Sequence, residues 1–176
     1  MTRNIVWEEI RKTASYIYGI EKYTKAKRKY NTGSKLFTFI IAIVCVITTI
    51  YPEWREATII TSIIVATCTF IKEFKPIYAQ PEEELRELDN ICDFYKGYLN
   101  KLEDFFTSNC YDSIDSLDDK KKEEFKKIIN TVGDRETTMK RLCRSSYWES
   151  KEARQKTSYH LKNGFPQAEN YLLRCD

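Results

Sequence analysis

The chain has 176 residues, of which 42% are hydrophobic and 31% charged, and its formal net charge is +3. This length accommodates one helical domain beside a membrane segment and excludes a large enzyme. So small a net charge gives no support to nucleic acid binding by the chain as a whole.

Residues 4–30 predict one long amphipathic helix. Side chains at the helical period define its stripe: Ile5, Ile10, Ala14, Ile17 and Glu21, broadened by Trp7, Ile20 and Tyr23. The polar stretch Asn31–Ser34, which includes a glycine, predicts the end of this helix. Residues 1–35 carry nine lysines and arginines against three glutamates. We interpret the basic segment 22–29 as an anchor on the membrane surface.

Two uncharged apolar runs follow, Leu36–Pro52 and Ala57–Ile71, separated by the short charged corner 53–56. They contain 17 and 15 residues. As helices they would extend about 25 Å and about 22 Å. The hydrocarbon core of a bilayer is about 30 Å thick, so both runs are short for spans.

The residues around these runs favour a membrane hairpin. Lysines and arginines precede the first run and follow the second, whereas the corner holds one arginine and two glutamates. This pattern predicts a multi-pass protein of the inner (plasma) membrane with both termini in the cytoplasm. The alternative is a hairpin buried in a soluble core, since isoleucine, valine and threonine also form strands.

The second run carries a candidate pore lining. Thr58, Ser62, Val65 and Thr69 fall on one helical face at spacings of four, three and four residues. Hydroxyl groups in an apolar helix can line a water-filled path, and they can equally mediate ordinary helix packing. Glu53 and Glu56 would then ring the outer mouth and Glu73 the inner mouth, which favours cations.

Residues 82–106 predict a second long helix, which begins after Pro81 with three glutamates. Its apolar positions step by three and four residues and predict a helix-packing seam: Leu88, Ile91, Tyr95, Tyr98, Leu102 and Phe105. A third helix is expected through Phe125 and Val132, capped by Asp115 or Ser116 and stopped by Gly133.

Basic and aromatic residues alternate between positions 134 and 162. On a single helix they would form neighbouring faces that resemble a phosphate and base site, and we take as candidate nucleotide-binding residues Lys140, Arg141, Arg144, Trp148 and Lys151. The alternative is a solvated helix face with the tryptophan in the core.

No catalytic signature stands out. The sequence lacks phosphate-binding, dinucleotide-binding and nucleophile-elbow motifs, its six cysteines show no CxxC spacing, and its single histidine has no ligand-spaced partner. We therefore expect no catalytic residues, no metal, no cofactor and reduced structural thiols.

The order of segments resembles the SLATT family, two-span effectors of prokaryotic conflict systems found beside nucleotidyltransferases. The resemblance covers about residues 5–105. It rests on an amphipathic helix with Ser15–Gly19 (SYIYG) and Lys25–Arg28 (KAKR), followed by two short spans and a helical cytoplasmic part. It implies a homo-oligomeric channel or pore, gated by a nucleotide signal in antiphage defence.

We therefore predict an all-α membrane protein with three segments. They are an N-terminal amphipathic helix (1–34), a two-helix transmembrane hairpin (35–75) and a cytoplasmic helical assembly or sensor domain (76–176). We expect a non-enzymatic channel, tetrameric at the simplest, that depolarises the membrane and arrests growth. Its ligand would be a nucleotide or short oligonucleotide made by a partner nucleotidyltransferase. The alternative is a non-conducting adaptor that anchors a partner enzyme.

Overall fold

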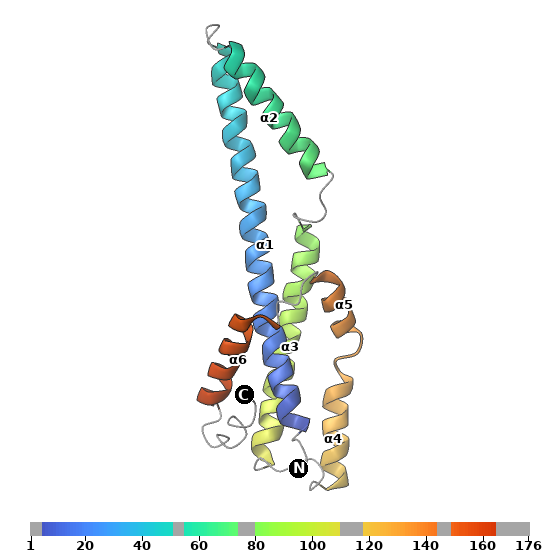
Figure 1. The fold of residues 1–176 in the computed structure, drawn as a ribbon. Helices are drawn as coiled ribbons and strands as arrows, with labels where there is room; N and C mark the ends of the chain where they lie inside the picture. The colour runs from blue at the N-terminus through green and yellow to red at the C-terminus, as the bar shows by residue number, and fades with distance from the viewer. Residues whose placement is uncertain (1–4, 51–54, 74–79, 110–117, 144–148, 165–176) are drawn as a thin grey trace. The chain divides into compact units, whose positions relative to one another are not determined.

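The computed structural model describes residues 5–50, 55–73, 80–109, 118–143 and 149–164. Every regular element in these ranges is a helix, which confirms the all-α prediction (Figure 1). Packing divides the chain into two compact units, residues 1–24 with 86–176, and residues 25–85. The three functional segments inferred from the sequence stay predictions.

The first helix, α1 (Ile5–Ile50), is continuous through the stretch Asn31–Ser34, so the predicted helix end there is wrong. Asn31 does not compete with its own backbone, because its side-chain Nδ2 donates a hydrogen bond to the carbonyl of Gln80 at 2.9 Å. Gly33 lies in the helix interior, and the glycine cost of about 1 kcal/mol is small within a 46-residue helix. Tertiary contact therefore overrides the local signal.

In the first unit, the N-terminal part of α1 packs on α3 (Glu82–Ser108). All six predicted seam residues of α3 are buried, as are Trp7, Ile10, Ala14, Ile17, Ile20 and Tyr23 of α1. Ile5 is an exception at 52% exposure, and Glu21 is exposed and pairs with Lys96 at 2.8 Å. Aromatic rings fill the contact, with Trp7 and Phe106 at a centroid distance of 5.4 Å.

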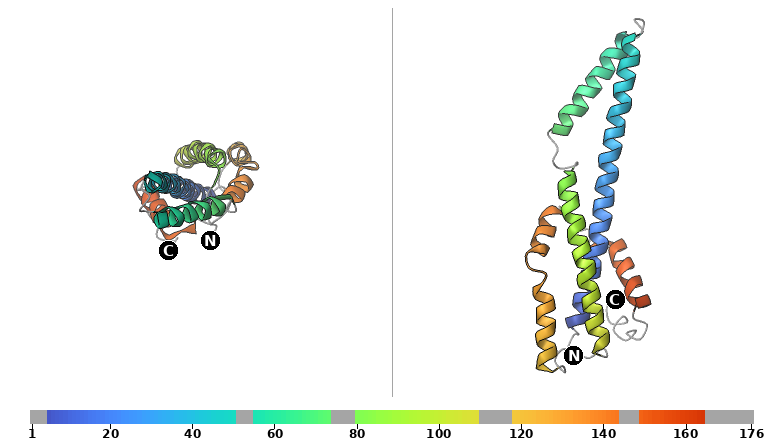
Figure 2. Two further views of the ribbon diagram at one scale, coloured as in Figure 1. Left: turned by 90° about the horizontal axis from the view of Figure 1, so that it is seen from above. Right: turned by 180° about the vertical axis from the view of Figure 1, so that it is seen from behind.

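Three shorter helices flank this pair, α4 (Asp119–Asn130) and α5 (Arg135–Leu142) on one side and α6 (Lys151–Gly164) on the other (Figures 1 and 2). Asp118 caps α4, since its carboxylate accepts a hydrogen bond from the backbone of Lys120 at 3.1 Å. The predicted caps, Asp115 or Ser116, are therefore wrong for this helix, and both residues lie outside the described residues. The helix ends at Asn130, before the predicted Val132, and the predicted stop Gly133 has a positive φ of 51° in the turn that follows.

The basic segment does not form the single helix on which its shared faces were predicted. α5 ends at Leu142, its C-cap residue Cys143 has a ψ of 87°, and α6 begins only at Lys151. Because Lys140 and Lys151 lie on different helices, the helical period does not place them on one face.

In the second unit, α2 (Arg55–Glu73) runs back antiparallel to the C-terminal half of α1 (Figure 1). Within the described residues, one helix is long and apolar enough to cross a membrane, the Ile5–Ile47 part of α1, and none of its apolar window is buried. α2 has charged residues at both ends, which leaves an uncharged run of 15 residues.

Candidate functional site

The C-terminal half of α1 and the middle of α2 expose large apolar side chains. On α1, Phe39 is 63% exposed, Val46 62% and Ile50 68%, and on α2 Ile60 and Ile63 are each 59% exposed. Soluble monomers rarely expose a contiguous apolar surface of more than a few hundred Å². The hairpin thus has the surface expected of a segment that lies against lipid or against other apolar helices.

The four predicted pore-lining residues all lie in α2, at helix positions that share one face. Ser62 is exposed and Val65 half-buried, while the side chains of Thr58 and Thr69 are not described. Conduction along this face stays a prediction.

Neighbouring hydroxyls are satisfied within the helices. Thr61 donates to the carbonyl of Ala57 at 2.8 Å, and Thr67 donates to that of Ile63 at 2.8 Å. Such bonds to the preceding turn make a hydroxyl tolerable in hydrocarbon. Both threonines therefore have their hydroxyl donors paired within α2.

The structure describes only some of the carboxylates that were predicted at the pore mouths. Glu56 lies in the first turn of α2 and is exposed, and Glu73 is its last residue, with a side chain that is not described. Glu53 lies outside the described residues. Glu56 and Glu73 lie at opposite ends of α2. The function of all three carboxylates stays a prediction.

The candidate nucleotide-binding residues are divided between two helices. Lys140 and Arg141 are exposed on α5, and Lys151 is exposed at the start of α6. Arg144 and Trp148 lie outside the described residues. Lys140 is already engaged, because its Nζ lies 2.6 Å from Oε1 of Glu136.

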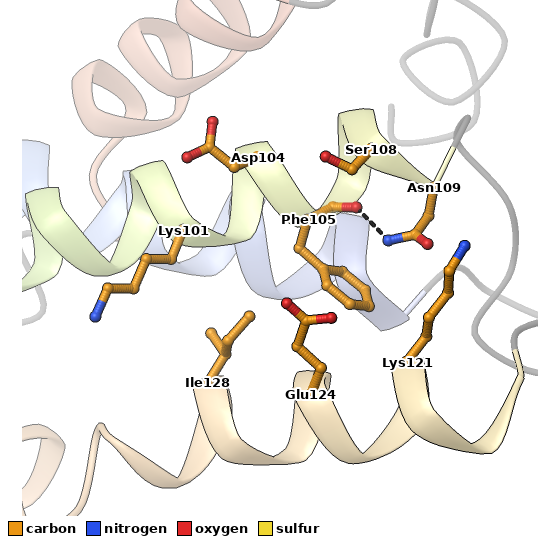
Figure 3. A pocket seen from close by; sticks show the side chains of 8 residues that line it. All are labelled: Lys101, Asp104, Phe105, Ser108, Asn109, Lys121, Glu124 and Ile128. Carbon is orange, nitrogen blue, oxygen red and sulfur yellow. Dashed lines mark hydrogen bonds between the residues drawn. The ribbon is translucent and has the colours of Figure 1, made fainter.

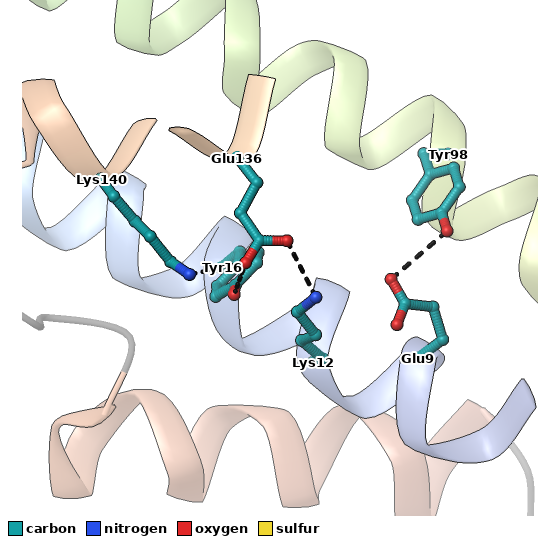
Figure 4. Close-up of polar contacts among 6 residues, drawn as sticks. All are labelled: Glu9, Lys12, Tyr16, Tyr98, Glu136 and Lys140. Carbon is teal, nitrogen blue, oxygen red and sulfur yellow. Dashed lines mark hydrogen bonds and ion pairs between the residues drawn. The ribbon is translucent and has the colours of Figure 1, made fainter. Parts of the chain in front are cut away.

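Glu136 is the centre of a polar cluster that the sequence did not predict (Figure 4). Its carboxylate accepts hydrogen bonds from Lys12 Nζ at 2.9 Å, Tyr16 Oη at 3.0 Å and Lys140 Nζ at 2.6 Å. Partial burial acts to raise the pKa of Glu136, but the bonds from Lys140, Lys12 and Tyr16 outweigh it and lower the pKa from 4.5 to about 2. The cluster joins α5 to α1.

Only one part of this cluster was accessible from sequence. Glu136 and Lys140 are four residues apart on one helix, a spacing that favours an ion pair. The partners on α1 lie 120 and 124 residues away, and no local pattern indicates them. Beside the cluster, Tyr98 donates to Glu9 at 3.4 Å.

A pocket of about 250 Å³ lies between α1, α3 and α6. His160, at its edge, lies 2.9 Å from Glu103 and packs against the ring of Tyr18 at a centroid distance of 6.3 Å. The hydrogen bond with Glu103 raises the pKa of His160, against the effect of its partial burial. This contact holds α6 on α3.

A second pocket, of about 400 Å³, lies between α3 and α4 (Figure 3). Phe105 and Ile128 form apolar walls, and Lys121 and Glu124 bring opposite charges to the same opening. Asn109 closes one end, where its Nδ2 donates to the carbonyl of Phe105 at 2.6 Å. Among the described residues of the predicted nucleotide site, Lys140, Arg141 and Lys151 line neither pocket.

The described residues provide no group of three histidine, cysteine, aspartate or glutamate side chains that could hold a metal ion. Cys92 and Cys143 are free, buried thiols. Burial raises the pKa of Cys92 and of Cys143 to about 12, so both are protonated and poorly nucleophilic at neutral pH.

Comparison of the chain with protein-family models, with curated proteins and with solved structures gives no match. The resemblance to the SLATT family therefore stays a prediction.

Proposed function

We propose that this protein is a homo-oligomeric membrane effector whose α1–α2 hairpin enters the inner membrane and forms an ion-conducting pore. The observation that carries the proposal is the contrast along α1. Its first half buries an apolar stripe against α3, whereas the apolar window of its second half has no buried residue. Lipid and neighbouring subunits are the surroundings that suit this second half.

The short uncharged runs favour assembly. A span shorter than the bilayer is accommodated by local thinning or by oligomerisation. Two helices cannot enclose a water-filled path, so a pore needs about four or more subunits, and we propose a tetramer as the simplest case. The face of α2 with Thr58, Ser62, Val65 and Thr69 would line it, with Glu53, Glu56 and Glu73 at its mouths.

The proposed signal is a nucleotide or short oligonucleotide made by a partner nucleotidyltransferase, as the family resemblance implies. Arg141 and Lys151 are exposed and able to meet a phosphate, with Arg144 and Trp148 as further candidates. Lys140 is held by Glu136, so a phosphate would have to replace that carboxylate. Ligand binding would then loosen the link between α5 and α1.

Ion flux from liposomes that contain the purified full-length protein tests the proposal, with the mass of the protein in detergent measured in parallel. We expect a discrete oligomer and a flux that responds to nucleotides added on the side of the C-terminal domain. Arg141→Ala and Lys151→Ala should weaken that response and its salt dependence.

The same experiment separates the pore from its alternative. A non-conducting adaptor for a partner enzyme would be a monomer or dimer, and its liposomes would stay tight with every nucleotide tested. Tight liposomes with a discrete higher oligomer, also when extract from cells that express a neighbouring nucleotidyltransferase is added, would refute the pore.

A further inference from the structure

The part of α1 that leads into its apolar half is strongly basic. From Lys22 to Ile50 the helix carries six lysines and arginines and no acidic residue. Two of these cations are neutralised within the protein. Lys22 pairs with Glu152, and Arg28 pairs with Glu82 at 3.3 Å.

Lys25, Lys29 and Lys35 differ from these two. All three are exposed, and none forms an ion pair with another described residue. We call these three residues the basic collar. Lys25 and Lys29 lie four residues apart on one helix, a spacing at which like charges destabilise the helix. The protein thus holds an unneutralised repulsive pair at a place where its other cations have partners.

The basic collar adjoins the exposed apolar surface. Lys35 directly precedes Leu36, whose side chain is 58% exposed. At 1.5 Å per residue, Lys29 lies about 10 Å and Lys25 about 16 Å before that residue along the helix axis. A lysine side chain can extend part of this distance toward the interface, and the attraction of an anionic surface extends over a Debye length of about 8 Å.

We propose that the basic collar binds the anionic phospholipid headgroups of the leaflet that α1 enters. Charge complementarity indicates an anionic partner, and continuity with the apolar surface indicates that this partner is a lipid leaflet. This inference rests on the proposed insertion of the hairpin and names the lipid class that stabilises it. A second copy of the chain would bring a like-charged collar, which makes it the less favourable occupant.

The test measures which lipids surround the full-length protein in vesicles of mixed phosphatidylglycerol and phosphatidylcholine. Spin-labelled forms of each lipid are added, and the motionally restricted fraction gives their relative association constants. We expect the association constant of phosphatidylglycerol to exceed that of phosphatidylcholine about fivefold or more. A fivefold ratio corresponds to the about 1 kcal/mol that one cation gains near an anionic surface. The preference should disappear in about 1 M salt, where the Debye length is about 3 Å.

The test variant is Lys25→Gln, Lys29→Gln and Lys35→Gln together, which should lose the preference. The control, Lys120→Gln, Lys121→Gln and Lys126→Gln, removes the same charge from exposed positions of α4 and should keep it. Equal association of both lipids with the wild-type protein, or a preference that survives in the collar variant, would overturn the proposal and leave insertion intact. A preference that persists in 1 M salt would also overturn it, and this measurement needs no variant.

Failure of the proposed function looks different. If neither spin-labelled lipid shows a restricted fraction, the hairpin does not contact lipid, and both the insertion and the headgroup site are refuted. If the restricted fraction is present and the lipids associate equally, only the headgroup site is refuted. An acidic protein or a second chain would then be the occupant of the basic collar.

Discussion

Replacing Glu136 by glutamine tests whether the Glu136 cluster holds α5 on α1. A fall of the pKa from 4.5 to about 2 sets an upper limit of about 3.4 kcal/mol on the contribution of the ionised carboxylate. The side chain is 27% exposed, so water screens its charge and we expect about 1–2 kcal/mol. Such a loss increases local opening of α5 about 5- to 30-fold.

Cys143 reports this opening directly. It follows the last residue of α5, its backbone N–H donates to Met139 at 2.7 Å, and it is 2% exposed. We expect a maleimide to label Cys143 about 5- to 30-fold faster in Glu136→Gln, measured by mass spectrometry of the cysteine peptides. Cys92, buried on α3, serves as the internal reference and should keep its rate.

The matched control is Glu123→Gln, which makes the same change at an exposed position of α4. If both variants leave the labelling of Cys143 unchanged, the cluster does not hold α5.

The pH dependence of stability gives a second check. Because the folded pKa of Glu136 lies below its unfolded value, its contribution is complete above about pH 4.5 and is lost as the pH falls toward 2. The difference in denaturation midpoint between wild type and Glu136→Gln should therefore narrow from pH 7 to pH 3.

Three further predictions concern the core, the pore and the histidine. Leu102→Ala, at a fully buried position, should lower the free energy of unfolding by about 2–5 kcal/mol in detergent, and a loss below about 1 kcal/mol would contradict the packing. Ser62→Trp should abolish ion flux from liposomes, whereas Ile63→Trp, on another face of α2, should leave it intact, and equal flux in both would remove Ser62 from the lining. His160, the single histidine, should titrate above 6.5 by NMR and return toward 6.5 in Glu103→Gln. Because its folded pKa is raised, its contribution to stability is present below about pH 6.5 and lost as the pH rises through the folded value, and an unchanged titration in Glu103→Gln would contradict the contact.

Helix identity and the buried face of α3 could be read from sequence, because the period of 3.6 residues is a property of the helix itself. Every seam residue from Leu88 to Phe105 is buried as the spacing predicts. The exposed apolar half of α1 could also be predicted from sequence, for a related reason. A run of 17 residues without charge has an extreme composition, and composition is visible without any tertiary contact.

Other features depend on residues that are distant in sequence. The helix break expected at Asn31–Ser34 is absent, because Asn31 bonds to Gln80, 49 residues away. The described residues of the predicted nucleotide site are divided between α5 and α6, because the backbone leaves the helical conformation at Cys143. The partners of Glu136 on α1 were likewise inaccessible from sequence.

The sequence by itself therefore determined the helical class, the apolar stretch of α1 and the packing seam. These follow from local periodicity and composition, which each segment carries on its own. Only the tertiary structure decided that α1 is continuous, that Lys140 pairs with Glu136 and that His160 meets Glu103. Such contacts depend on how helices far apart in the chain pack together, and short polar or charged side chains accept many partners. Their final partner is set by proximity in the fold.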